Sequence, residues 1–501
     1  MQLPALNYET LAAQNYQGYL LKDAPVRVLQ FGEGNFLRAF VDYFIDVLNE
    51  KAGFNAKVML TQPIGQGLAG LINQQQGLYT LCLRGSEDGQ AVDARRVISC
   101  VSRCLNPYED YAALLEQAHN PDLRYIVSNT TEAGIVYDPA PRFEDTPPAS
   151  FPAKLTRFLY ERYTAFSGAP DKGLVILSCE LIDNNGKELA ACVDKHIADW
   201  ALPAEFAAWV KQSCIFCSTL VDRIVPGRIR DAAAVAKLEQ ELGYHDELLD
   251  VGEVFGFWVI EGPQSLAEEL PFARAGLPVI FTDDVTPYKK RKVRILNGAH
   301  TSMVLGAYLA GQNIVRNCMQ DEVIRGFMNK AIYDEIIPTL PLPKAELDEF
   351  AAAVADRFNN PFVDHELLSI SLNSTSKWRA RVQPSLESYL EEQGKLPRCL
   401  TMSLAALIAF YGCHIEGKED NALVCRRPAG DVYKVMDDAW VLDFYWQNKD
   451  AAPAALAEAV LKNEEMWGRD LTALPGFADA VKADLALILE KGAYEAYKSC
   501  L

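Results

Sequence analysis

The sequence is short of positive charge. Its 48 lysine and arginine residues are outnumbered by 67 aspartate and glutamate residues, which gives a formal net charge of −19. Proteins that bind nucleic acids or anionic membranes need a basic surface, because phosphate groups and acidic lipids attract cations. The charge balance therefore argues against both nucleic acid and membrane as partners.

The sequence also lacks a cysteine framework and targeting signals. Twelve cysteines are scattered along the chain, and only Cys214 and Cys217 form a CxxC pair, with no histidine close by. This pattern predicts no metal site and is typical of a reducing compartment. The N-terminus MQLPALNYET has no basic segment followed by an apolar run. The longest uncharged run, residues 399–415, predicts a buried helix and is slightly short for a membrane span. We therefore expect a cytoplasmic protein.

The 501 residues, half of them apolar, have the composition of a globular protein with two or three domains. Short apolar runs at residues 26–31, 57–61, 125–128 and 174–178 are separated by helical patterns. Strands that alternate with helices indicate a mainly parallel sheet. Beyond residue 285 long helical patterns dominate, at residues 298–311, 318–337, 344–357, 400–412 and 452–466. The sequence therefore predicts an α/β domain over residues 1–285 and a mostly α-helical domain over residues 286–501.

The first chemical motif is FGEGNF, which consists of Phe31, Gly32, Glu33, Gly34, Asn35 and Phe36. A strand, a Gly-x-Gly turn and a helix together form the geometry that receives a pyrophosphate. The helix is expected from the apolar stripe of Phe36, Phe40, Phe44 and Leu48. The third glycine of the usual fingerprint is replaced by Leu37, so a plain turn between strand and helix is the alternative. The end of the second strand, VMLTQPIGQG, has no acidic residue for the ribose, which leaves NAD and NADP open.

Three further polar residues follow expected strands. Glu132 comes after the strand at 125–128, Asn185 after the strand at 174–178, and Asp222 lies beside Arg223 in STLVDRIVPG. The carboxyl edge of a parallel sheet is where ligands bind in open α/β folds. Taken singly, however, each of these residues is better explained as a turn residue or a surface ion pair.

The segment KVRILNGAH places Lys292, Asn297 and His300 on one short stretch. On an α-helix they lie at roughly 0°, 140° and 80°, so they can share a face. A lysine with basic neighbours can act as a general base, an asparagine amide can donate to a developing alkoxide, and a histidine can orient a hydroxyl. Together they suit hydride transfer; the alternative is a basic helix end followed by an asparagine-glycine turn.

Three segments resemble the long-chain mannitol dehydrogenase family. The Lys-x4-Asn-x2-His spacing is similar to its catalytic motif, LVDRIVP at residues 220–226 to its signature stretch, and FGEGNFLRAF at residues 31–40 to its cofactor turn. The similarity extends from the first strand to beyond residue 380. Within the family, the segments SCELID, KVRILNGAHT and NPFVDHELLSISLNSTSKWRARV look closest to members that reduce keto-sugar acids.

The resemblance implies a Rossmann-type N-terminal domain, NAD as cofactor, a small sugar-acid substrate and no catalytic zinc. It implies that Lys292 is the general acid/base, that Asn297 and Asn185 form the oxyanion site, and that His300 contacts substrate. Glu132 would serve a proton relay or gate, and Asp222 would lie in the site with the cofactor turn. Lys377 matches a substrate-contacting lysine. Arg379 and Arg381 are near it in sequence: all three share a face in an extended segment, but only Lys377 and Arg381 do so in a helix.

Two departures bear on the substrate. Ser369 stands where polyol-oxidising members have an arginine, and Lys289 stands where they have a glutamate. Both place polyol specificity in doubt. A different sugar or polyol, or a nucleotide-binding sensor without catalysis, therefore stays in view. The oligomeric state is left open between a monomer and a small homo-oligomer.

Overall fold

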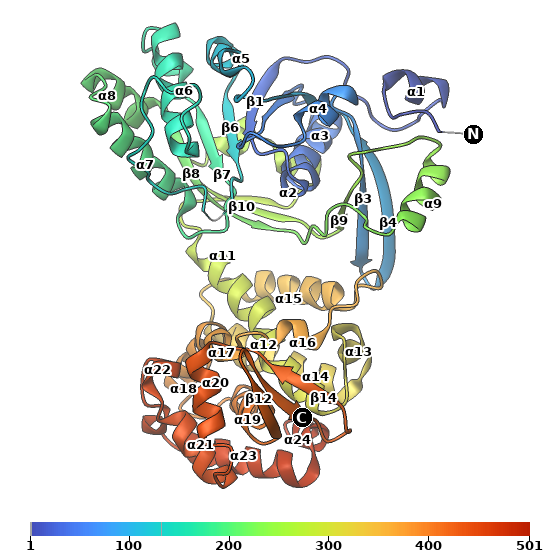
Figure 1. The fold of residues 1–501 in the computed structure, drawn as a ribbon, viewed down its shortest axis with the longest axis vertical. Helices are drawn as coiled ribbons and strands as arrows, with labels where there is room; N and C mark the ends of the chain where they lie inside the picture. Colours follow the sequence, from blue (N-terminus) through green and yellow to red (C-terminus); the bar gives the residue numbers. More distant parts are fainter. Residues whose placement is uncertain (1–2, 132) are drawn as a thin grey trace. The chain divides into compact units, whose positions relative to one another are not determined.

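The computed structural model describes residues 3–131 and 133–501 of the chain (Figure 1). These form two compact units. The first contains the chain up to Arg84 together with Val92–Val285, and the second contains Gly85–Ala91 and Thr286–Leu501.

The first unit is built on an eight-stranded sheet with the strand order β11-β10-β8-β7-β6-β1-β2-β5. Neighbouring strands are parallel except for β8 and β10. The strands are β1 (Val26–Phe31), β2 (Lys57–Thr61), β5 (Val101–Leu105), β6 (Tyr125–Ser128), β7 (Val175–Ser178), β8 (Ile215–Asp222), β10 (Phe257–Glu261) and β11 (Val279–Thr282). The predicted mainly parallel sheet is confirmed.

Both faces of this sheet are buried. Val28 belongs to an apolar cluster with α3 and α4, whereas Leu29 belongs to a second cluster with α5, α6, α7 and α8. Successive side chains of β1 point to opposite faces of the sheet and are buried in two different cores. For this reason the parallel strands appear in the sequence as uninterrupted apolar runs. The helices of this unit are α1 (Tyr8–Ala13), α2 (Asn35–Ala39), α3 (Val41–Ala52), α4 (Ala69–Gln74), α5 (Tyr111–Glu116), α6 (Phe151–Ala165), α7 (Asn185–Asp199), α8 (Ala204–Ser213), α9 (Ala232–Leu242) and α10 (Leu266–Glu269) (Figure 1).

The helix expected after the glycine turn is broken into α2 and α3 at Phe40, which has φ −121° and ψ −77°. The aromatic stripe nevertheless persists across the break. The rings of Phe36 and Phe40 lie 5.3 Å apart between centroids, and those of Phe40 and Phe44 lie 4.8 Å apart. The apolar face therefore packs as predicted, although the helix is not continuous.

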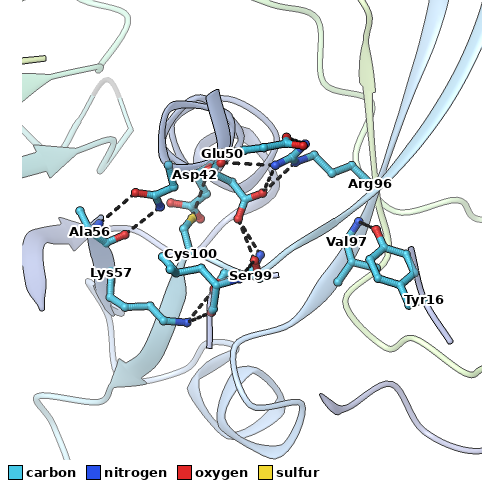
Figure 2. A network of polar contacts seen from close by, with 12 residues as sticks. Tyr16, Asp42, Glu50, Ala56, Lys57, Arg96, Val97, Ser99 and Cys100 are labelled. Carbon is cyan, nitrogen blue, oxygen red and sulfur yellow. Dashed lines mark hydrogen bonds and ion pairs between the residues drawn. The ribbon is translucent and has the colours of Figure 1, made fainter. Parts of the chain in front are cut away.

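A second sheet that the sequence did not predict consists of β4 (Gln90–Ile98), β3 (Tyr79–Glu87) and β9 (Asp250–Glu253), in that order. A buried polar network ties β4 to α3 (Figure 2). Asp46 accepts hydrogen bonds from Arg96 Nε at 2.7 Å and from the backbone N–H of Ser99 at 2.9 Å. Lys57 Nζ donates to the carbonyl of Ser99 at 2.7 Å. Because each buried charge has partners, the network holds the hairpin against the helix.

The second unit is mostly helical, as predicted. Its helices are α11 (Thr286–Arg291), α12 (Gly298–Leu309), α13 (Val315–Gln320), α14 (Glu322–Lys330), α15 (Lys344–Phe358), α16 (Leu367–Ile370), α17 (Ser374–Arg381), α18 (Gln383–Gln393), α19 (Arg398–Gly412), α20 (Ala439–Gln447), α21 (Pro453–Leu461), α22 (Glu464–Trp467), α23 (Phe477–Lys491) and α24 (Ala493–Lys498). α12 and α19 are buried along almost their whole length and pack on each other.

Two departures from the expected helices occur in this unit. Residues Lys292–Asn297 and Ala331–Ile336 form π-helical segments, and the helix expected over 318–337 is divided among shorter pieces. A small antiparallel sheet of β12 (Ile415–Glu419), β13 (Ala422–Arg426) and β14 (Val432–Val435) was also not expected. Among the described residues, no helix is long and apolar enough to cross a membrane.

Candidate active site

The glycine turn follows β1, an interior strand of the large sheet that lies between β2 and β6. Gly32 has φ +126°, and a Cβ there would lie 3.1 Å from Leu37 Cδ1 and 3.2 Å from the carbonyl oxygen of Asn129. Gly34 precedes α2 without a side-chain cap, and a Cβ at Gly34 would meet no atom within 4 Å. Only glycine fits the first position, and the second leaves the start of α2 open to a ligand.

A cavity of 470 Å³ opens beside this turn. It is lined by Phe36 from α2, by Asn129, Thr131 and Ala133 after β6, and by Leu181 after β7. The chain continues from β1 to β2 on one side and later returns to β6 on the other, so the cavity lies at the switch point of the sheet. Ligands bind at such switch points in open α/β sheets. The candidate Glu132 lies outside the described residues.

The other two candidates of the first unit are buried. Asn185 Nδ2 donates to the carbonyls of Glu180 at 2.9 Å and Thr219 at 3.0 Å, and its Oδ1 accepts from the N–H of Thr219 at 2.8 Å. These bonds occupy the side-chain amide of Asn185 and join the start of α7 to the loop after β7 and to strand β8. Asp222 is buried at the end of β8. The reading of Asp222 and Arg223 as a surface ion pair is wrong, because Arg223 is buried and donates to the carbonyls of Ala39 and Phe255.

Glu180, which the sequence did not mark as a site residue, connects the ends of β6 and β7 at the carboxyl edge of the large sheet. Its carboxylate accepts from Ser128 Oγ at 3.1 Å and from the N–H and hydroxyl of Thr130, each at 3.0 Å. Burial raises the pKa of Glu180, and these donors lower it in part. The loop after β6, which lines the cavity, is thereby fixed to the loop after β7. Its position within SCELID, two residues past β7, was the available signal.

The π-helical segment carries two of the candidates in the second unit. Lys292 begins the segment and Asn297 ends it. In a π-helix, backbone hydrogen bonds join residues five positions apart in the sequence. The side chains of Lys292 and Asn297 therefore lie one turn apart on one side of the helix. π-Helical turns inside helices occur frequently at functional sites. The sequence placed the residues on one helix, but only the wider turn aligns Lys292 with Asn297.

The asparagine-glycine pair is not a turn. Asn297 has φ −74° and ψ −35°, and Gly298 has φ −64° and ψ −41°, so both are helical. A Cβ at Gly298 would lie 3.2 Å from the carbonyl oxygen of Arg381, so the glycine allows α17 to approach α12 closely. The alternative interpretation as an asparagine-glycine turn is therefore wrong.

His300 lies one helical turn after Asn297 and stacks on Phe358, with ring centroids 3.8 Å apart and planes 12° from parallel. His365 meets its ring edge-on at 5.4 Å. Burial, followed by the nearby His365, Arg357, Arg381 and Lys377, holds the pKa of His300 well below its usual range. Its buried Nε2 makes no hydrogen bond within the part of the chain that the structure describes. His300 is therefore a neutral imidazole surrounded by cations.

The structure resolves the ambiguity at Lys377, Arg379 and Arg381, because α17 is a helix. Lys377 and Arg381 lie one turn apart. Burial, and then the nearby Arg381, lower the pKa of Lys377, and both residues contribute to the lowered pKa of His300. Lys377 Nζ donates to the carbonyl of Ile370 at 2.9 Å, which orients its ammonium group. Arg379 lies elsewhere, with Nη1 donating to the carbonyl of Glu465 at the start of α22 at 3.4 Å. The structure thus brings His300, Lys377 and Arg381 together and separates Arg379 from them.

Phe358 and His365 were missed by sequence reasoning. Both lie more than 50 positions from His300, and nothing in the local pattern marks either as a neighbour of KVRILNGAH. The scarcity of histidine, six in the whole chain, was the one available signal. Within the described residues, no group of three or more His, Cys, Asp or Glu side chains could hold a metal ion.

The Rossmann-type sheet with its glycine turn defines a dinucleotide-binding class of protein. The chain matches the family models of the mannitol dehydrogenase Rossmann domain over residues 26–274 and of the mannitol dehydrogenase C-terminal domain over residues 284–489. It is 48% identical to an altronate oxidoreductase of Escherichia coli O7:K1, over 95% of this chain and 96% of that protein. It is 47% identical to an altronate oxidoreductase of Enterobacter sp. (strain 638), over 98% and 99% of the two chains.

Two solved structures share the fold. A substrate-free D-sorbitol dehydrogenase matches with a TM-score of 0.76 and 22% identity, over 94% of this chain and 95% of that chain. A ternary complex of Pseudomonas fluorescens mannitol 2-dehydrogenase with NAD and D-mannitol matches with a TM-score of 0.64 and 23% identity, over 99% of each chain. The chain belongs to the mannitol dehydrogenase family, as its catalytic spacing and cofactor turn indicated.

Proposed function

We propose that this chain is an NAD-dependent oxidoreductase that interconverts D-tagaturonate and D-altronate in hexuronate catabolism. The observation that carries the proposal is the constellation in the second unit, where Lys292 and Asn297 share one π-helical turn and His300 is surrounded by Lys377 and Arg381. The relatives named altronate oxidoreductase, which match over nearly the whole length of this chain, support the proposal. So do the segments that resemble tagaturonate reductase.

The first unit fits a NAD-type dinucleotide. Gly32 and Gly34 allow a ligand to approach the backbone after β1, and Phe36 lines the 470 Å³ cavity at the switch point. NADH, when bound, supplies the hydride. The chain's own residues must then hold the keto acid and deliver one proton to the oxygen that becomes a hydroxyl.

Lys292 provides that proton in this proposal. During reduction its ammonium group donates to the keto oxygen, and during oxidation the free amine accepts the hydroxyl proton. Asn297, one π-helical turn away, donates an amide N–H to the same oxygen while negative charge develops there. Asn185 has given both of its amide protons to backbone carbonyls, so in this proposal it positions the loop and Asn297 serves as the donor.

The substrate carboxylate is assigned to the cations around His300. A carboxylate transferred into a partly closed site needs charged donors, because an unpaired buried charge is costly. Lys377 and Arg381 present two such donors from one face of α17, and the neutral His300 can bond a neighbouring hydroxyl without adding charge. Asp437 is an acidic residue near Lys377. Its Oδ2 accepts hydrogen bonds from the Tyr411 hydroxyl and from the backbone N–H of Thr375.

A substrate panel tests this function. The purified protein is mixed with NADH and, in turn, tagaturonate, fructuronate and fructose, and absorbance is followed at 340 nm. We expect the fastest NADH consumption with tagaturonate and altronate as the product. Preference for fructuronate would indicate a fructuronate reductase, and preference for fructose would indicate a mannitol-type polyol dehydrogenase. No oxidation with any of them would favour a nucleotide-binding sensor.

A further inference from the structure

The loop after β2 lacks the residue that usually reads the adenosine ribose. In Rossmann-type domains an acidic residue near the end of the second strand binds the ribose 2′-hydroxyl of NAD, and a basic residue accommodates the 2′-phosphate of NADP. Here residues 62–68 are QPIGQGL, with neither an acid nor a base. The usual position therefore offers no discrimination between the two dinucleotides.

A carboxylate reaches this loop from the glycine turn instead. Glu33, between Gly32 and Gly34, is 8% exposed, and its Oε1 accepts from the N–H of Leu68 at 3.4 Å. A Cβ on Gly67 would lie 2.3 Å from the same oxygen, so the carboxylate occupies space that any other residue at position 67 would take. The Glu33 side chain thus reaches from the turn after β1 to the far end of the loop after β2, just before α4.

Both ends of this contact are fixed. Arg38 Nε donates to the backbone carbonyl of Glu33 at 3.1 Å, which holds the turn. Gln62 Nε2 donates to the carbonyl of Ile64 at 2.9 Å, and its Oε1 accepts from the N–H of Ala69 at 3.3 Å, which holds the loop. The carboxylate is therefore presented by rigid elements at the edge where a dinucleotide binds.

We infer that Glu33 replaces the missing acid after β2, so that its carboxylate accepts hydrogen bonds from the adenosine ribose hydroxyls of NAD and repels the 2′-phosphate of NADP. The inference rests on the proposed function, because it assumes a dinucleotide at the glycine turn. Arg38, which contacts the turn, and Lys154, which contacts the loop, are already engaged. Arg38 bonds the carbonyl of Leu248, and Lys154 bonds the carbonyl of Ala149 and the hydroxyl of Tyr108. A 2′-phosphate at this loop would therefore be repelled by the Glu33 carboxylate, and these two engaged cations would not offset the repulsion.

A purely structural role for Glu33 makes a different prediction. If the carboxylate only braced the loop through Leu68, its loss would lower thermal stability and weaken NADH and NADPH binding alike. If it reads the ribose, its loss changes the ratio of the two affinities. The ratio of the NADH and NADPH affinities therefore distinguishes the two roles, because a general loss of binding affects both affinities equally and leaves their ratio unchanged.

The experiment titrates the full-length protein with NADH and with NADPH, without substrate, and follows nicotinamide fluorescence. We expect the wild type to bind NADH at least about 100-fold more tightly than NADPH. Glu33→Gln keeps the size of the side chain and removes its charge. It should lower the ratio of the NADPH dissociation constant to the NADH dissociation constant about 10-fold or more, mainly through tighter NADPH binding. Glu188→Gln, at an exposed position in the first turn of α7, is the matched control and should leave the ratio unchanged.

Two further variants keep the inference testable if Glu33→Gln folds poorly. Glu33→Asp shortens the side chain but keeps its charge, so it should weaken NADH binding and still exclude NADPH. Gly67→Ala adds a methyl group against the carboxylate and should weaken NADH binding. An unchanged affinity ratio in Glu33→Gln, or a wild type that binds both dinucleotides equally, would overturn the role of Glu33. A wild type that binds neither would instead contradict the proposed function.

Discussion

Replacement of Lys377 by methionine tests how the protein distinguishes a sugar acid from an uncharged sugar. Methionine keeps the length and apolar stem of the side chain and removes the ammonium group. In the structure that group is held by the carbonyl of Ile370 at 2.9 Å and lies close to Arg381 and His300. Because it is already oriented, little side-chain entropy is lost when a carboxylate binds.

The size of the effect follows from the bond that is lost. A hydrogen bond to a charged group contributes about 1.5–3 kcal/mol, and about 1.4 kcal/mol corresponds to a tenfold change. Lys377→Met should therefore raise the KM for tagaturonate about 10- to 150-fold. The KM for fructose, which has no carboxylate, should change by less than about threefold, since an uncharged hydroxyl gains little from an ammonium group.

The assay measures initial rates of NADH oxidation for both sugars with each variant. Arg381→Met should show the same selective loss, because Arg381 lies one turn along the same face of α17. Arg379→Met should show a much smaller change, since its guanidinium contacts the carbonyl of Glu465. Equal losses for tagaturonate and fructose with Lys377→Met would refute the reasoning, because Lys377 would then serve the common hydroxyls or the fold.

Two other predictions concern the oxyanion donor and the core of the first unit. Asn297→Ala should lower kcat more than it weakens NADH binding, and Asn297→Asp should be worse, because a carboxylate repels the developing alkoxide; better activity of the Asp variant would exclude this role. Burial raises the pKa of Asp42 to about 7, against the smaller opposing effects of the Tyr79 hydroxyl and Arg38. A carboxyl group with a raised pKa stabilises the fold while protonated, and this contribution, at most about 4 kcal/mol, is lost as pH rises from about 4 to about 7. Asp42→Asn should therefore raise the Tm at pH 8 relative to the wild type and leave it nearly unchanged at pH 4; an equal shift at both pH values would contradict the assignment.

The large sheet was predictable because its strands are buried on both faces. Val28 and Leu29 face different cores, so the strand at 26–31 reads as a continuous apolar run, and the same holds for the strands at 57–61 and 125–128. The hairpin of β3 and β4 was not predictable in this way. β4 is largely exposed and carries Arg95 and Arg96, whose partners Glu241 and Asp46 are far away in the sequence.

The candidate site was predictable in its residue types and not in its geometry. The spacing of Lys292, Asn297 and His300 was visible in the sequence, but hydrophobic periodicity carries no signal for a π-helical turn, because the neighbouring α-helices dominate the pattern. The same limit applies to Lys377 and Arg381. Their shared face required knowing that α17 is a helix, and their proximity to His300 is a tertiary contact between residues almost eighty positions apart.

In the proposed mechanism Lys292 transfers the proton, and the glycine turn of the first unit binds the cofactor. The most direct test mixes the Lys292→Ala enzyme, saturated with NADH, with tagaturonate at neutral pH, and follows absorbance at 340 nm after NADH binding has been measured separately. We expect the variant to bind NADH with an affinity within about twofold of the wild type and to reduce tagaturonate about 10²- to 10⁴-fold more slowly. Near-normal reduction of tagaturonate by Lys292→Ala would contradict this mechanism, because Lys292 could not then be the proton donor.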